Sequence, residues 1–231
     1  MNIALVLSGG TGTRLGADMP KQYIEVCGKP ILIYCLETLF NSSVIDGIHI
    51  VAVKEWQDKI LFWLEAYGLE DKFRSFSLPG ENRQLSIYNG LKDIKEYADP
   101  KDLVLVHDGA RPLLSSALIA ECFEAIEDYD GVLPVLPMKD TVYLSKDGKQ
   151  ITALLKRSEV FAGQAPELFR LGAYYRANER LLPDKILQIN GSTEPAVLGD
   201  LKVAVIPGDE ANFKITTPAD LERFTNIVCG C

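Results

Sequence analysis

The chain has 231 residues, which suits one large domain or two small ones, and its 47% hydrophobic share can supply a sizeable core. The formal net charge is −8, and no tract rich in lysine and arginine stands out, which argues against a nucleic-acid partner. The apolar run at the start is too short for a signal peptide or a membrane span, so we expect a cytoplasmic protein with no membrane partner.

The five cysteines are odd in number and irregularly spaced, so they do not predict a disulfide framework. Two of them end the chain as Cys229-Gly230-Cys231, with no second Cys or His pair nearby in the sequence. We therefore interpret this end as a frayed tail in preference to a metal or redox site.

Hydrophobic periodicity predicts strands that alternate with helices over the first 137 residues. The expected strands are 3–7, 48–54, 73–78, 103–108 and 131–137, and the expected helices are 30–40, 55–69, 83–97 and 116–129. This alternation indicates a mostly parallel sheet with helices on both faces, which is a three-layer α/β fold. We find no internal repeat and no linker, so residues 1–231 are predicted to form a single domain.

The pattern changes after Pro137. Two β-prone runs, 142–145 and 150–155, flank a Lys146-Asp147-Gly148 turn, which predicts a hairpin. The hairpin has either to fold back on its own domain or to pack elsewhere. The remaining elements are a helix at 171–182, a strand at 201–208 and a helix at 217–228, which begins at Thr217-Pro218.

The strongest functional pattern lies in the first 23 residues. The strand at 3–7 runs into Ser8-Gly9-Gly10-Thr11-Gly12-Thr13-Arg14, whose consecutive backbone N–H groups can form a nest for phosphate oxygens. Arg14 and Lys21 add positive charge, so the segment predicts a polyphosphate site. It matches neither the P-loop nor the dinucleotide fingerprint, since Leu15 stands where the latter needs Gly or Ala. A generic glycine-rich turn is the alternative.

Other charged residues fall where predicted strands end, and in parallel sheets such ends share one edge and bind ligands. Asp108 follows one strand and is the best candidate ligand for Mg²⁺, with a helix-cap or turn aspartate as the alternative. Gly109 beside it allows a ligand to approach the backbone closely. Six cations oppose the acidic overall charge, and we expect some of them to cluster: Arg14, Lys21, Arg83, Arg111, Arg157 and Lys214.

Three segments together carry a family resemblance: residues 9–14, Pro20-Lys21-Gln22-Tyr23 and Gly28-Lys29-Pro30-Ile31. They resemble the opening of the sugar-phosphate nucleotidyltransferases, and the Pro-Lys-Gln form is similar to the cytidylyltransferases for 2-C-methylerythritol 4-phosphate and ribitol 5-phosphate. The resemblance continues to Lys214 and covers nearly the whole chain. It implies a Rossmann-like nucleotidyltransferase fold, and it implies that residues 139–165 form an arm that contacts a second subunit in a homodimer.

The resemblance also implies CTP and a polyol phosphate as substrates, Mg²⁺ as cofactor, and roles for individual residues. Arg14, Lys21 and Lys214 are the expected catalytic cations, and Asp108 is the expected metal ligand. The expected nucleotide contacts are Ser8, Gly9, Gly10, Thr11, Gly12, Thr13, Gly80, Ser86 and Gly109. The expected acceptor contacts are Asp140, Thr141, Arg157, Gln164 and Thr193, of which Thr141 and Arg157 serve the partner subunit's site. Arg83 is interpreted instead as structural, fixing the loop at Gly80 against a carboxylate.

One departure from the family pattern bears on the acceptor. The chain has Ala165-Pro166-Glu167 where the family has Thr-Pro-Gln, which removes a hydroxyl that could bind the acceptor. This favours ribitol 5-phosphate over methylerythritol 4-phosphate, and Trp56 and Gly163-Gln164 also resemble the ribitol branch. A transferase for another sugar phosphate or base and a nucleotide-binding regulatory domain stay open. A phosphate monoester is already ionised at neutral pH, so the expected reaction needs no strong general base.

Overall fold

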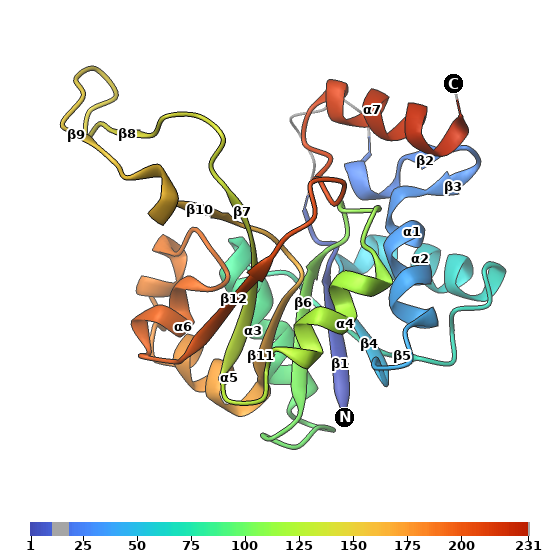
Figure 1. The fold of residues 1–231 in the computed structure, drawn as a ribbon. Coiled ribbons are helices and arrows are strands. Elements are labelled where there is room, and N and C mark those ends of the chain that lie inside the picture. Colours follow the sequence, from blue (N-terminus) through green and yellow to red (C-terminus); the bar gives the residue numbers. More distant parts are fainter. Residues whose placement is uncertain (11–18, 231) are drawn as a thin grey trace.

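The computed structural model describes residues 1–10 and 19–230, which fold around one mixed sheet (Figure 1). In the described residues the sheet has eight strands: β1 (Asn2–Leu7), β4 (Gly47–Val51), β5 (Phe73–Ser77), β6 (Leu103–Asp108), β7 (Gly131–Pro137), β10 (Phe161–Gly163), β11 (Glu167–Arg170) and β12 (Val203–Pro207). Their order is β10–β7–β11–β6–β1–β4–β5, with β12 also on β7. The predicted parallel pairing is confirmed for β1 with β4 and β6, for β4 with β5 and for β7 with β12. The short antiparallel strands β10 and β11 were not predicted.

Helices cover both faces of the sheet, as expected for a three-layer α/β fold. They are α1 (Ile31–Asn41), α2 (Lys54–Ala66), α3 (Arg83–Ile94), α4 (Ser116–Glu124), α5 (Leu171–Glu179), α6 (Glu194–Leu198) and α7 (Pro218–Cys229). Alternate residues of β1 serve the two layers. Ala4 and Val6 pack with α1, α2 and α4, whereas Ile3 and Leu5 pack with α3 and α5, and all four are fully buried. This explains why β1 reads as a continuous apolar run.

The strand order changes direction at β1 and β6. Strands β4 and β5 follow β1 outward on one side, whereas β6 lies on the other side of β1. The carboxyl ends of β1 and β6 therefore diverge into loops that leave in different directions, which is where α/β folds place their ligands. Gly9 follows the end of β1 and Asp108 ends β6, so the fold puts both at this edge.

The predicted hairpin is confirmed as β8 (Tyr143–Leu144) paired antiparallel with β9 (Ala153–Leu154). It projects away from the sheet at the end of a long arm rather than folding back on its own domain (Figure 1). Large apolar side chains along this arm are exposed: Tyr143, Leu144, Ile151, Leu154 and Phe161.

The number and spacing of the cysteines predicted no disulfide framework, yet one pair is bonded. Cys27 lies in the turn between β2 (Glu25–Val26) and β3 (Lys29–Pro30), and it is bonded to Cys229 at the end of α7. The two residues are 202 positions apart in sequence, with Cα atoms 6.0 Å apart. Packing of α7 on this part of the chain, through a small cluster that includes Phe224, brings them together. The expected frayed tail is therefore tied down at Cys229, while Cys231 lies outside the described residues.

A buried histidine makes stability depend on pH. His49 on β4 accepts a hydrogen bond from the Tyr97 hydroxyl (3.0 Å) and donates to Ser77 Oγ (2.7 Å), which itself donates to Asp93. The neutral ring satisfies this arrangement, and burial lowers the pKa of His49 to about 4 although Asp93 opposes the shift.

Because the unfolded chain takes up the His49 proton first, His49 should lower the free energy of unfolding by about 2 kcal/mol between pH 7 and pH 5. His107, whose pKa burial also lowers to about 4, should add a fall of similar size. Urea unfolding at both pH values measures this change. In a His49→Gln variant the free energy of unfolding should fall by about 2 kcal/mol less between pH 7 and pH 5 than in the unaltered protein. An unchanged dependence in that variant would show that His49 is not responsible.

Candidate active site

A cavity of about 610 Å³ lies at the carboxyl ends of β1 and β6. Its lining includes seven residues that the sequence predicted for the site: Gly9, Gly10, Lys21, Gly80, Ser86, Asp108 and Lys214. These residues come from separate segments of the chain, so the structure brings four of the nine predicted nucleotide contacts together with Lys21, Asp108 and Lys214. Thr11, Gly12, Thr13 and Arg14 lie outside the described residues.

The start of the glycine loop is held by the Pro-Lys-Gln-Tyr segment. Gln22 Nε2 donates to the carbonyl oxygens of Ser8 (2.7 Å) and Gly10 (2.9 Å), and the Tyr23 hydroxyl donates to the Ser8 carbonyl (2.8 Å). Ser8 itself is buried, and its hydroxyl bonds to Tyr23. Lys21 lines the cavity from the same segment. The motif therefore has a physical basis: two of its side chains fix the loop and a third brings a cation to the cavity.

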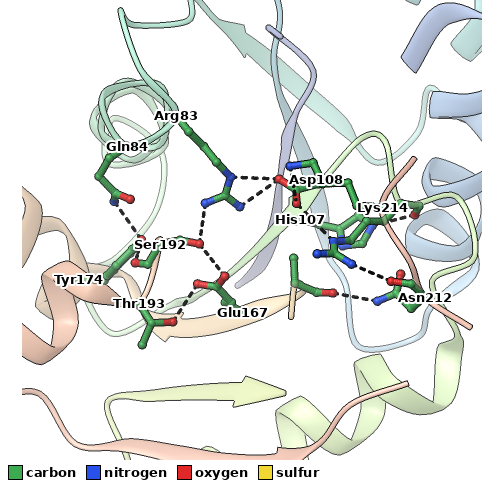
Figure 2. Close-up of polar contacts among 12 residues, drawn as sticks. Arg83, Gln84, His107, Asp108, Glu167, Tyr174, Ser192, Thr193, Asn212 and Lys214 are labelled. Carbon is green, nitrogen blue, oxygen red and sulfur yellow. Dashed lines mark hydrogen bonds and ion pairs between the residues drawn. The ribbon is translucent and has the colours of Figure 1, made fainter. Parts of the chain in front are cut away.

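Asp108 gathers three cations at the cavity (Figure 2). Its carboxylate lies 3.0 Å from Arg83 Nη2, 3.1 Å from Lys214 Nζ and 3.3 Å from Arg111 Nε. Burial alone would raise the pKa of Asp108, but the three positive charges outweigh it and hold that pKa far below its ordinary value. One negative charge among three positive ones leaves the cluster positive, which suits a polyphosphate ligand.

The same contacts decide how well Asp108 fits a metal ion. Its Oδ1 atom accepts from Arg83 Nε (3.1 Å) and Nη2 (3.0 Å), while Oδ2 faces Arg111 and Lys214. These four contacts fill the roughly four lone-pair sites of the Asp108 carboxylate. Within residues 1–10 and 19–230, no group of three or more His, Cys, Asp and Glu could hold a metal. Mg²⁺ needs only one protein carboxylate when phosphate oxygens and waters complete its shell, so the site fits the ion once Lys214 turns to a phosphate. The metal role of Asp108 stays a prediction.

Arg83 also connects the cavity to the chain around Thr193. Its Nη1 atom donates to Ser192 Oγ (2.6 Å), and Ser192 donates to Glu167 Oε1 (2.5 Å). Thr193 donates to the other Glu167 oxygen at 3.0 Å (Figure 2). The expected pairing of Arg83 with a carboxylate is confirmed, and Asp108 is its partner. Sequence reasoning missed the connection of Glu167 and Ser192 to Arg83 beside the cavity, although the Glu in place of the family's Gln was a usable signal.

The remaining predicted site residues that the structure describes do not line this cavity. Gln164 is buried, and its side-chain amide bonds to Asp209 and to the Asn212 carbonyl, so it holds the loop before Lys214. A Cβ on Gly109 would lie 2.9 Å from the Leu32 side chain, so close packing explains this glycine. The exposed arm carries Asp140, Thr141 and Arg157.

Comparison with known proteins decides the family. Residues 2–229 match the family model IspD, 2-C-methyl-D-erythritol 4-phosphate cytidylyltransferase. The chain belongs to the IspD family. It is therefore a cytidylyltransferase, an enzyme of the nucleotidyltransferase class. In the part of the chain that the structure describes, no helix is long and apolar enough to span a bilayer.

Relatives in the IspD family carry two different acceptor names. A 2-C-methyl-D-erythritol 4-phosphate cytidylyltransferase of Geobacter metallireducens is 35% identical over 94% of this chain and 93% of its own length. A ribitol-5-phosphate cytidylyltransferase of Vibrio parahaemolyticus is 32% identical over 99% of this chain and 96% of its own. The crystal structure of 4-diphosphocytidyl-2C-methyl-D-erythritol synthase from Anaerococcus prevotii superposes with a TM-score of 0.83 at 30% identity, covering 100% of this chain and 96% of that one.

Proposed function

We propose that this IspD-family chain transfers the cytidylyl group of CTP to a polyol phosphate, with ribitol 5-phosphate as the preferred acceptor. The products are the CDP-polyol and pyrophosphate. The observation that carries this proposal is the positive cluster around Asp108, which adjoins the glycine loop in one cavity. Such a site attracts a triphosphate and an acceptor phosphate together.

In this reaction a phosphate oxygen of the acceptor attacks the α-phosphorus of CTP, and the bond to pyrophosphate breaks. No proton has to leave the attacking group, so positioning and charge stabilisation are the main tasks of the protein. Lys21 and Lys214 line the cavity, and we assign to them and to Arg14 the stabilisation of this charge. Lys214 is partly exposed and pairs with Asp108, so it can exchange that contact for a phosphate. Mg²⁺, when bound beside Asp108, would neutralise further phosphate charge.

We place the cytidine near the turn at Gly80, on the wall of the same cavity. The Gly80 N–H donates to Ser86 Oγ (3.0 Å), and Ser86 donates to the Asn82 carbonyl (2.8 Å). A Cβ on Gly80 would lie 2.5 Å from Leu85, so glycine is required for this turn. The turn is thus fixed by contacts within the chain, which lowers the entropic cost of binding.

The preference for ribitol 5-phosphate rests on Ala165. This residue is buried and offers no side-chain hydroxyl, and its carbonyl accepts from Asn212 Nδ2 (2.8 Å). The alternative acceptor is 2-C-methyl-D-erythritol 4-phosphate, which is favoured by the family model and by the name of the relative with 35% identity.

We further propose that the chain acts as a homodimer through its arm. Exposed apolar side chains on the arm, such as Ile151 and Leu154, need a partner surface. Asp140, Thr141 and Arg157 would then serve the site of the second subunit. Light scattering measures the assembly state directly, and a monomer at enzyme-assay concentration would remove Arg157 from the acceptor site.

Pyrophosphate release from CTP and Mg²⁺ tests the proposed reaction, with ribitol 5-phosphate and 2-C-methyl-D-erythritol 4-phosphate assayed side by side. We expect turnover with both or with ribitol 5-phosphate alone, and a higher kcat/KM for ribitol 5-phosphate. Preference for methylerythritol phosphate would show that the argument from Ala165 is wrong. CTP binding without turnover on either acceptor would favour the regulatory-domain alternative or a different acceptor.

A further inference from the structure

Glu167 is a buried carboxylate outside the cavity, and it accepts two hydroxyl protons. Only 7% of the residue is exposed. Ser192 Oγ donates to Oε1 at 2.5 Å, and Thr193 Oγ1 donates to Oε2 at 3.0 Å. Burial raises the pKa of Glu167, while the charge of Arg83 and the two hydroxyl donors oppose the shift. An ionised carboxylate accepts at both oxygens, so this set of contacts suits the charged form.

The direction of each hydrogen bond follows from the donors that surround Ser192. Arg83 Nη1 can only donate hydrogen bonds, so Ser192 Oγ must accept from it at 2.6 Å. The one proton of Ser192 is then free to go to Glu167. The Ser192 carbonyl accepts from the Tyr174 hydroxyl at 2.6 Å, which fixes the backbone at this point. Ser192 is therefore held from three sides and cannot reverse its polarity.

Thr193 follows Ser192, and its hydroxyl donates its proton to the carboxylate of Glu167 as well. It stands at the N-cap position of α6, yet its side chain makes no capping hydrogen bond to that helix. Its hydroxyl thus keeps only oxygen lone pairs for a further partner. Lone pairs attract O–H donors and repel phosphate oxygens.

We propose that Glu167 is a positioning residue that sets the hydrogen-bond polarity of the acceptor site. By taking the Thr193 proton, it makes Thr193 a pure acceptor that selects a hydroxyl group of the polyol and not its phosphate. This inference rests on the proposed function and on the expectation, implied by the family resemblance, that Thr193 contacts the acceptor. It assigns the polyol end to Thr193 and leaves the acceptor phosphate to the cations of the cavity.

A Glu167→Gln variant would reverse this polarity. The amide oxygen must face Ser192, because Ser192 still donates its proton, so the amide NH₂ faces Thr193. Thr193 then accepts from the amide and points its own proton at the substrate. We expect the KM for the polyol phosphate to rise about tenfold, because the substrate hydroxyl would have to turn its own proton away from Thr193 and lose the hydrogen bond that it donates there. The KM for CTP should change less than threefold, because Arg83 keeps both of its bonds to Asp108.

The experiment measures pyrophosphate release with the polyol phosphate that the unaltered protein uses and with its analogues that lack one hydroxyl. The unaltered protein should discriminate about tenfold against one analogue. Thr193→Val should lose that discrimination, and Thr193→Ser should keep it. The double variant Glu167→Gln with Thr193→Val should have a KM for the polyol phosphate no higher than that of Thr193→Val alone. Asp93→Asn is the matched control, since it also exchanges a carboxylate that accepts from a serine hydroxyl.

Several outcomes would overturn the inference. One is an unchanged polyol KM in Glu167→Gln, and another is an equal rise in the KM values for polyol and CTP, which indicates a purely structural role. If Glu167→Gln does not fold, retained discrimination in Thr193→Val overturns the inference instead. Absence of turnover in the unaltered protein would be a different failure, because it removes the proposed function itself and this inference with it.

Discussion

A Lys21→Ala variant should lose about 10²–10³-fold in kcat and keep its fold, as expected when one donor that stabilises transition-state charge is removed. Lys21 lines the cavity from a short 3-10 turn (Lys21–Tyr23). Its neighbours Gln22 and Tyr23 hold the glycine loop with their own side chains, so truncation of Lys21 leaves those bonds in place. The effect should therefore fall on the reaction and not on the loop.

Steady-state kinetics with CTP and ribitol 5-phosphate measure the effect, together with thermal unfolding of the variant. Lys101→Ala is the matched control, because Lys101 is exposed and precedes β6 at the end of the strand opposite to Asp108. Its kcat should stay within twofold of the unaltered protein. Near-normal turnover in Lys21→Ala would remove Lys21 from the catalytic residues. Loss of folded protein would show instead that Lys21 is needed for stability. Its charge lies close enough to Asp220 to lower the pKa of that carboxyl, so Lys21 has a partner through which it could stabilise the fold.

An Asp108→Asn variant should lose stability as well as activity. The amide keeps the shape of the side chain but removes the charge that Arg83, Arg111 and Lys214 share. Breaking a buried ion pair costs about 3–5 kcal/mol, and we expect roughly 3 because the ends of Arg83 and Lys214 reach solvent. The free energy of unfolding in urea measures the loss at neutral pH.

Pyrophosphate should restore part of this stability, because three unpaired cations bind an anion more strongly than the neutralised cluster does. Thermal unfolding with and without pyrophosphate should show a larger rise in Tm for Asp108→Asn than for the unaltered protein. Glu37→Gln is the control, since the half-exposed pair of Glu37 with Lys29 should contribute less than 1 kcal/mol. A variant as stable as the unaltered protein, with no added response to pyrophosphate, would contradict the role of Asp108 as the centre of the cluster.

The sequence by itself determined the elements whose signals are local. The apolar run of β1 and the helical spacing of α1 and α2 depend on residues a few positions apart, and both predicted types are found. The start of α7 was also readable, because Thr217 and Asp220 form a capping box over three positions. The glycine loop and the Pro-Lys-Gln-Tyr segment predicted a nucleotide site in the same way, since Ser8 and its partner Tyr23 lie within 15 residues of each other.

Only the tertiary structure decided which distant groups meet. Cys27 and Cys229 are bonded across 202 positions, and Arg83 reaches Ser192 across 109. In the sequence Glu167 is one departure from the family's Thr-Pro-Gln, yet in the structure it accepts from two hydroxyls that lie 25 and 26 positions away along the chain. Such pairs arise because packing of the two helix layers on the sheet fixes where the loops between elements lie. No local period in the sequence encodes the distance between groups so far apart along the chain.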